Sequence, residues 1–147
     1  MKKMTLPYFQ LFLIRVYLGL DIIPHFTEKL FQGPEHRAEV VKAFVSLGLS
    51  YPTFMVILAG LIELSIAIGF TFGFMTRIAA VGAALYLVIS SFLGGHFVNG
   101  FMWVKPGGGW EFPVLWAFLC LTFILTGGGP WSLDALLRQR SKLWIYK

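Results

Sequence analysis

Residues 52–72 read PTFMVILAGLIELSIAIGFTF, and this stretch decides the fold class. A helix needs about 20 mostly apolar residues to cross the roughly 30 Å hydrocarbon core of a bilayer. The stretch has that length, and its one ionisable side chain is Glu63. Pro52 stands at its start, where a helix has no use for the missing backbone N–H. We therefore expect residues 52–72 to form a membrane-spanning helix.

Three further apolar stretches lie on either side of this segment, at residues 7–26, 78–97 and 112–126. The last is short for a span, and the Gly-Gly-Gly-Pro sequence at 127–130 should end its helix. A tight turn at 73–76 should make the second and third spans antiparallel neighbours. The sequence predicts an all-α integral membrane protein, a four-helix bundle, with residues 1–147 forming a single domain.

The composition excludes most soluble classes. Hydrophobic residues make up 57% of the chain and charged residues 13%, whereas soluble domains carry about 25% charged residues. A small soluble enzyme or a disordered chain is therefore excluded. The one cysteine, Cys120, lies in an apolar run. It rules out an intramolecular disulfide or paired-thiol chemistry, and we expect it to be a small apolar filler.

The lysines and arginines predict the orientation, because cytoplasmic loops of membrane proteins are enriched in them. The bias places both termini in the cytoplasm and predicts a multi-pass protein of the bacterial inner membrane. The net charge of +5 thus reflects the lipid bilayer as partner, and no nucleic acid is expected. An external loop at about 27–51 should hold a short amphipathic helix. The expected cytoplasmic cations are Lys2, Lys3, Arg77, Arg138, Arg140, Lys142 and Lys147, and the external ones are Lys29, Arg37, Lys42 and Lys105.

Two ionisable residues fall inside the apolar spans. A charge in a bilayer costs about 2.5–3.5 kcal/mol on insertion scales, so it usually faces a partner or a cavity. Arg15 in the first span and Glu63 in the second have opposite charges, and we expect them to pair. Such a pair can contribute to a binding site or only fix the helix register.

A second polar group lies near the external ends of the spans. Asp21 and His25 are four residues apart and share a helix face. His96, Asn99 and Glu111 fall at about the same depth. If they converge, these side chains can serve a quinone headgroup, a proton relay or a weak metal site. Their spacing matches no recognised ligand motif, so no metal is expected, and each residue also has an ordinary structural explanation.

The order of these residues resembles that of a known family. Arg15, Gly19, His25 and Lys29-Leu30 come first, followed by the sequence Leu-Gly-Leu-Ser-Tyr-Pro at 47–52. The remaining elements are Gly60, Glu63-Leu64, Gly69, Thr76-Arg77, His96, Asn99-Gly100, Glu111 and the sequence GGGPWSLD at 127–134. Together they resemble the DoxX family of small four-helix bacterial membrane proteins. The long loop between His96 and Glu111 is similar to the DoxD-like branch, which is associated with thiosulfate:quinone oxidoreductase.

The resemblance implies a membrane subunit of a redox system that interacts with quinone and with an external or membrane partner protein or a sulfur substrate. Its expected catalytic residues are His25, His96, Asp21 and Glu111, and its expected cofactor-binding residues are Arg15, Glu63 and Asn99. The sequence has no haem, iron–sulfur or flavin motif, so quinone is the expected cofactor. Two alternatives stay open: a non-enzymatic assembly or interaction module, and a small transporter built as a homo-oligomer.

Overall fold

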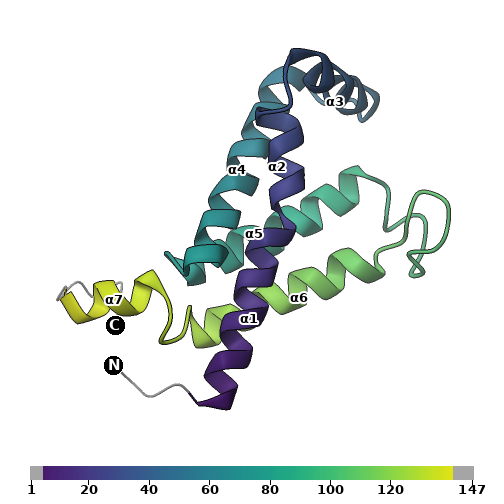
Figure 1. Ribbon diagram of the computed structural model, residues 1–147. Coiled ribbons are helices and arrows are strands. Elements are labelled where there is room, and N and C mark those ends of the chain that lie inside the picture. The colour runs from purple at the N-terminus through teal and green to yellow at the C-terminus, as the bar shows by residue number, and fades with distance from the viewer. Residues whose placement is uncertain (1–4, 141–147) are drawn as a thin grey trace.

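The computed structural model describes residues 5–140, and the helices and loops over this range include no β-strand. The first helix is nearly continuous: α1 covers Leu6–Asp21 and α2 covers Ile23–Leu30 (Figure 1). Ile22 between them keeps helical dihedral angles, and Pro24, which has no N–H, stands in the first turn of α2. The expected end at residue 26 is therefore wrong, because the helix continues to Leu30 and includes Lys29.

The other helices follow the sequence prediction closely. The loop helix is α3 at Pro34–Ser46, and α4 at Pro52–Phe72 has the predicted bounds. Helix α5 covers Thr76–Leu93, starting two residues earlier and ending four earlier than expected, and α6 covers Glu111–Thr126. Helix α7 at Leu133–Arg140 was not predicted from the sequence.

Within residues 5–140, three helical segments are long and apolar enough to cross a membrane: Leu6–Leu30, Pro52–Phe72 and Thr76–Leu93. Helix α6 is apolar but has 16 residues, which gives a length of about 24 Å. Large apolar side chains are exposed on all four segments, as expected for surfaces that face lipid. Among the most exposed are Leu6, Phe72, Phe92 and Leu125.

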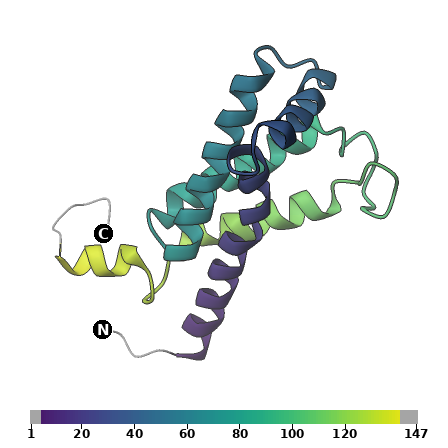
Figure 2. The same ribbon diagram turned by 45° about the horizontal axis from the view of Figure 1, so that its top comes forward.

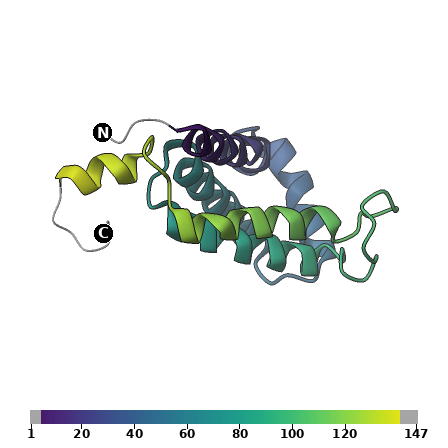
Figure 3. The same cartoon turned by 90° about the horizontal axis from the view of Figure 1, so that it is seen from below.

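One core cluster joins α1, α4, α5 and α6. Helices α1 and α2 pack on α4, while α5 packs along α6 in a second layer (Figure 3). Small residues allow close contacts: a Cβ on Gly69 would lie 2.5 Å from the Ala79 Cβ. Cys120 is buried in this cluster, so its predicted role as an apolar filler is confirmed. The cluster consists of Leu18, Ile66, Phe70, Ala80, Ala83, Cys120 and Phe123.

The two layers diverge toward the end of the molecule that carries α3. In Figure 1 the α5–α6 hairpin points away from α2 and α4, and its connecting loop lies apart from α3; in the turned view of Figure 2 the end of α5 passes behind α3. The start of α1 and helix α7 lie at the opposite end (Figure 1). A closed bundle of four membrane crossings, with both termini cytoplasmic, stays a prediction. Four of its expected cytoplasmic cations, Lys2, Lys3, Lys142 and Lys147, lie outside the described residues.

Candidate functional site

Three helices contribute to a buried polar network centred on Glu63. Lys29 of α2 is 6% exposed and Glu63 of α4 is 4% exposed. The Lys29 Nζ lies 3.2 Å from the Glu63 Oε1. Tyr86 of α5 donates its hydroxyl hydrogen to the same oxygen at 2.5 Å. An ammonium, a carboxylate and a phenol thus meet in one place inside the apolar helices.

The close approach of α2 and α4 positions this network. A Cβ on Gly60 would lie 2.8 Å from Leu30 Cγ and 3.1 Å from Lys29 Cβ, so a larger side chain would separate the helices. Gly60 is one turn before Glu63 on α4, and residues at this spacing share a helix face. The missing side chain therefore lets Lys29 lie against Glu63.

The network extends to a carboxylate that reaches solvent or headgroups. Lys29 Nζ also donates to the Glu28 Oε1 and to the His25 carbonyl oxygen, both at 2.9 Å. The Glu28 side chain is 37% exposed. At the other end, the buried Glu63 Oε2 has no hydrogen-bond partner within residues 5–140. The arrangement therefore leads from an accessible carboxylate to a buried oxygen that is free to accept a hydrogen bond or a proton.

The predicted pair of Arg15 and Glu63 is wrong. The Arg15 guanidinium donates to the carbonyl oxygens of Phe70, Thr71 (2.9 Å) and Trp131 (2.6 Å). Phe70 and Thr71 lie in the last turn of α4, where carbonyls have no partner within the helix. Arg15 is thus level with the end of α4, whereas Glu63 lies about two turns deeper along that helix.

The five residues of the expected external cluster fall into two groups. Asp21 and His25 are exposed, on α1 and α2. His96 and Asn99 lie in the 94–110 loop, where the His96 Nδ1 is 3.1 Å from the Gly108 carbonyl oxygen and the Asn99 Nδ2 donates to it at 3.1 Å. Glu111 accepts a hydrogen bond from the Trp103 N–H at 3.1 Å. Across the described residues, no hydrogen bond joins the two groups.

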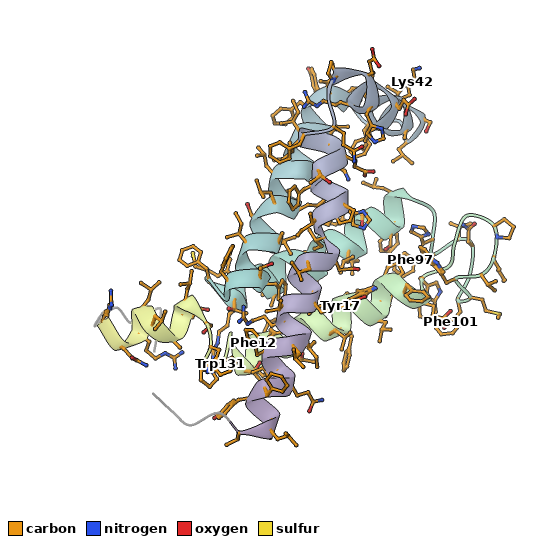
Figure 4. The ribbon with its side chains drawn as sticks, in the orientation of Figure 1. Phe12, Tyr17, Lys42, Phe97, Phe101 and Trp131 are labelled. Atoms are coloured by element: carbon orange, nitrogen blue, oxygen red, sulfur yellow. The ribbon has the colours of Figure 1, made fainter. Side chains whose placement is uncertain are left out.

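Aromatic contacts stabilise the 94–110 loop. Trp110 lies 4.7 Å from the ring centre of Phe101 and 6.4 Å from that of Phe97, and both phenylalanines lie at the end of the α5–α6 hairpin (Figure 4). His96 lies 5.3 Å from Trp103. The side chains of His96, Asn99 and Glu111 therefore have structural partners in the loop. Residues 5–140 contain no group of three His, Cys, Asp or Glu side chains placed to hold a metal ion.

The comparison with known families gives a match over more than half of the chain. The DoxX family model matches residues 10–96, a segment that contains Arg15, Lys29, Glu63 and Tyr86. The chain belongs to the DoxX family. No curated protein and no solved structure matches it. Family membership and the long apolar helices make it a membrane protein.

Two members of the buried network were not predicted from the sequence. Lys29 was counted among the cations of the external loop, because the first span was expected to end at residue 26. Tyr86 was not singled out, since a tyrosine in an apolar helix gives no charge signal. The available signal was the spacing of His25 and Lys29, which lie one turn apart if the helix continues past Pro24.

Proposed function

We propose that this DoxX-family protein is a multi-pass subunit of a quinone-linked redox system in the bacterial inner membrane. The observation that carries the proposal is the buried Glu63 carboxylate, with one oxygen held by Lys29 and Tyr86 and the other unpartnered. Buried ionisable groups in membrane helices are costly and commonly mark proton or substrate sites. A buried carboxylate oxygen without a hydrogen-bond partner lowers the stability of the fold, so its presence calls for a functional explanation.

The residues fit a quinone headgroup chemically. A bound quinone supplies two-electron chemistry, with electrons exchanged with an external or membrane partner protein or a sulfur substrate. Lys29 and Tyr86 already donate to Glu63, so a quinone carbonyl would take over one of these hydrogen bonds, and Glu63 can hold a proton at Oε2. Glu28, at the accessible end, can exchange protons with water.

The exposed His25 extends this proton route. Its side chain is exposed one turn before Lys29 on α2, and an imidazole can both donate and accept a proton. In this proposal Asp21, one turn further back, orients the His25 ring. The 94–110 loop, which is shaped by His96, Asn99 and Glu111, is the surface against which a partner protein docks.

The first test is to purify the protein in mild detergent and measure quinone per chain by mass spectrometry of an organic extract. We expect bound quinone in the wild type and a loss of at least about tenfold in Glu63→Gln and Tyr86→Phe, which corresponds to about 1.4 kcal/mol. Glu35→Gln and Tyr17→Phe are matched controls, since they remove the same groups outside the network. Wild-type protein without quinone, or equal loss in the controls, contradicts the proposal.

A second candidate is a non-enzymatic interaction module. It is favoured by the ordered 94–110 loop, which exposes Val98, Phe101, Met102 and Val104. Exposed apolar patches on a folded loop are typical of docking surfaces or of membrane interfaces. A module of this kind predicts that Val98→Ser and Val104→Ser weaken partner capture while Glu63→Gln does not.

A further inference from the structure

A second polar site lies at the opposite end of the helices from α3 and the 94–110 loop. A cavity of about 840 Å³ opens between the first turns of α1, the α4–α5 turn, the 126–132 segment and α7. It is separate from the buried network, and the proposed redox function does not use it. Three of its lining residues are basic: Arg15, Arg77 and Arg138.

The walls of this cavity are firmly built. Asp134 accepts hydrogen bonds from the backbone N–H groups of Met75 (2.7 Å) and Thr76 (2.9 Å), and its own N–H donates to the Gly73 carbonyl at 2.9 Å. A Cβ on Gly128 would lie 2.6 Å from the Thr76 Oγ1. The 127–134 segment is thus fixed against the α4–α5 turn.

Two buried polar atoms in the lining residues have no partner within residues 5–140. They are the Arg15 Nε and the Thr76 Oγ1. Arg15 is 1% exposed and Thr76 is 0% exposed, so bulk water does not compensate for the missing hydrogen bonds. Both atoms are closed to a water molecule, so a ligand in the cavity contacts the exposed Arg77 and Arg138 side chains.

The charge of the lining favours an anion. Arg15, Arg77 and Arg138 oppose a single carboxylate, Asp134, whose two oxygens already accept backbone hydrogen bonds. The lining therefore has a net charge of +2 from its three arginines and one aspartate. Guanidinium groups bind phosphate through several N–H donors at once.

Large apolar side chains line much of the cavity and favour an amphiphile as its ligand. Phe12, Phe72, Trp131 and Leu136 line it, and Phe72 and Trp131 are exposed on the outer surface. Trp131 also has the position typical of tryptophan at a membrane–water boundary. A free phosphate ion would gain nothing from such a wall, whereas the glycerol and upper acyl carbons of a lipid would pack on it.

We propose that this cavity binds the phosphate headgroup of an anionic phospholipid. Basic pockets at the ends of membrane helices are suited to such headgroups, and each arginine near the surface contributes about 1 kcal/mol. The apolar wall holds the start of the acyl chains. The net positive lining selects an anionic headgroup over a zwitterionic one.

The test is to reconstitute the purified protein in vesicles of mixed phosphatidylglycerol and phosphatidylcholine and to count the lipids retained per chain by native mass spectrometry. We expect about one tightly held phosphatidylglycerol in the wild type. Arg77→Gln and Arg138→Gln should each weaken its retention about fivefold, since RT ln 5 is about 1 kcal/mol. Arg140→Gln, on the same helix as Arg138 but outside the cavity lining, should leave retention unchanged.

A conservative variant separates binding from folding. Arg77→Lys keeps the charge but loses the planar guanidinium, so it should retain more lipid than Arg77→Gln, with the unfolding midpoint unchanged. Equal retention of both lipids, unchanged retention in the Arg77→Gln/Arg138→Gln double variant, or equal loss in Arg140→Gln would overturn the proposal. Displacement of the lipid by inorganic phosphate would assign the site to the free ion and overturn it as well.

Discussion

Replacing Arg15 by lysine tests how the end of α4 is held. The Arg15 Nη1 donates to the carbonyls of Phe70 and Thr71, and the Nη2 donates to the carbonyl of Trp131. These acceptors belong to two separate segments, the last turn of α4 and the 127–132 segment. Lysine keeps the charge but has one nitrogen, so it cannot serve both segments as the planar guanidinium does.

The expected loss follows from the Trp131 contact. A hydrogen bond from a charged donor contributes about 1.5–3 kcal/mol, and the buried charge itself is unchanged in Arg15→Lys. We therefore expect the free energy of unfolding to fall by about 1.5–3 kcal/mol. Arg140→Lys, on an exposed face of α7, should change it by less than about 0.5 kcal/mol.

The assay is reversible unfolding in mixed detergent and SDS micelles, followed by far-UV circular dichroism. Wild type, Arg15→Lys and Arg140→Lys are compared under one set of conditions. If Arg15→Lys unfolds at the same SDS fraction as the wild type, the three carbonyl contacts do not hold α4 to the 127–132 segment. The planar guanidinium would then not be what stabilises this end of the helix.

Three further predictions concern the packing and the orientation. Gly73→Ala should destabilise by at least about 1–2 kcal/mol in the same unfolding assay, because φ is +66° and a Cβ would lie 2.4 Å from Ser132 Cβ. Gly82→Ala should instead be neutral or stabilise by up to about 1 kcal/mol, since nothing lies within 4 Å of its Cβ; the reverse order would contradict this packing. Asp134→Ala should cost about 0.5–2 kcal/mol, because the carboxylate caps the start of α5, and an unchanged unfolding midpoint would rule out this cap. With the native cysteine replaced by serine, Glu39→Cys should react with an impermeant thiol reagent in spheroplasts and Gln139→Cys should not; reaction of both would contradict the predicted orientation.

The span boundaries could be predicted where the chain marks both ends. Pro52 starts α4, and Gly73, in a left-handed conformation, ends it. The apolar composition and the residues at the two ends therefore indicated the same bounds. The start of α6 near Pro113 and its end before Gly127 were predictable for the same reason. The far end of the first helix was not, because Pro24 lies in a first helical turn and does not stop the helix.

The partner of Glu63 could not be read from the sequence. A pairing of spans by depth needs the offset between antiparallel helices, and α1 begins about two turns beyond the end of α4. Arg15 therefore meets the α4 C-terminus, and Lys29 reaches Glu63 instead. The offset depends on the close contacts of Gly19 with Thr71 and of Gly60 with Leu30, which only the folded chain reveals.

The external residues show a different limit of sequence reasoning. His96, Asn99 and Glu111 were expected at one depth, and all three do contribute to one loop. Similar depth does not determine the lateral separation of helices, and the α5–α6 hairpin diverges from α2 (Figure 1). The roles predicted for these residues and for Asp21 and His25 stay predictions.

Photoaffinity labelling with an azido-quinone tests the proposed site most directly. The protein in native membranes is illuminated with the probe, digested, and the labelled peptides are sequenced by mass spectrometry. The buried network predicts labels on α4 and α5 near Glu63 and Tyr86, suppressed by excess unlabelled quinone and reduced in Glu63→Gln. Labels confined to the 94–110 loop, or labelling that unlabelled quinone does not suppress, would contradict a quinone site at Glu63.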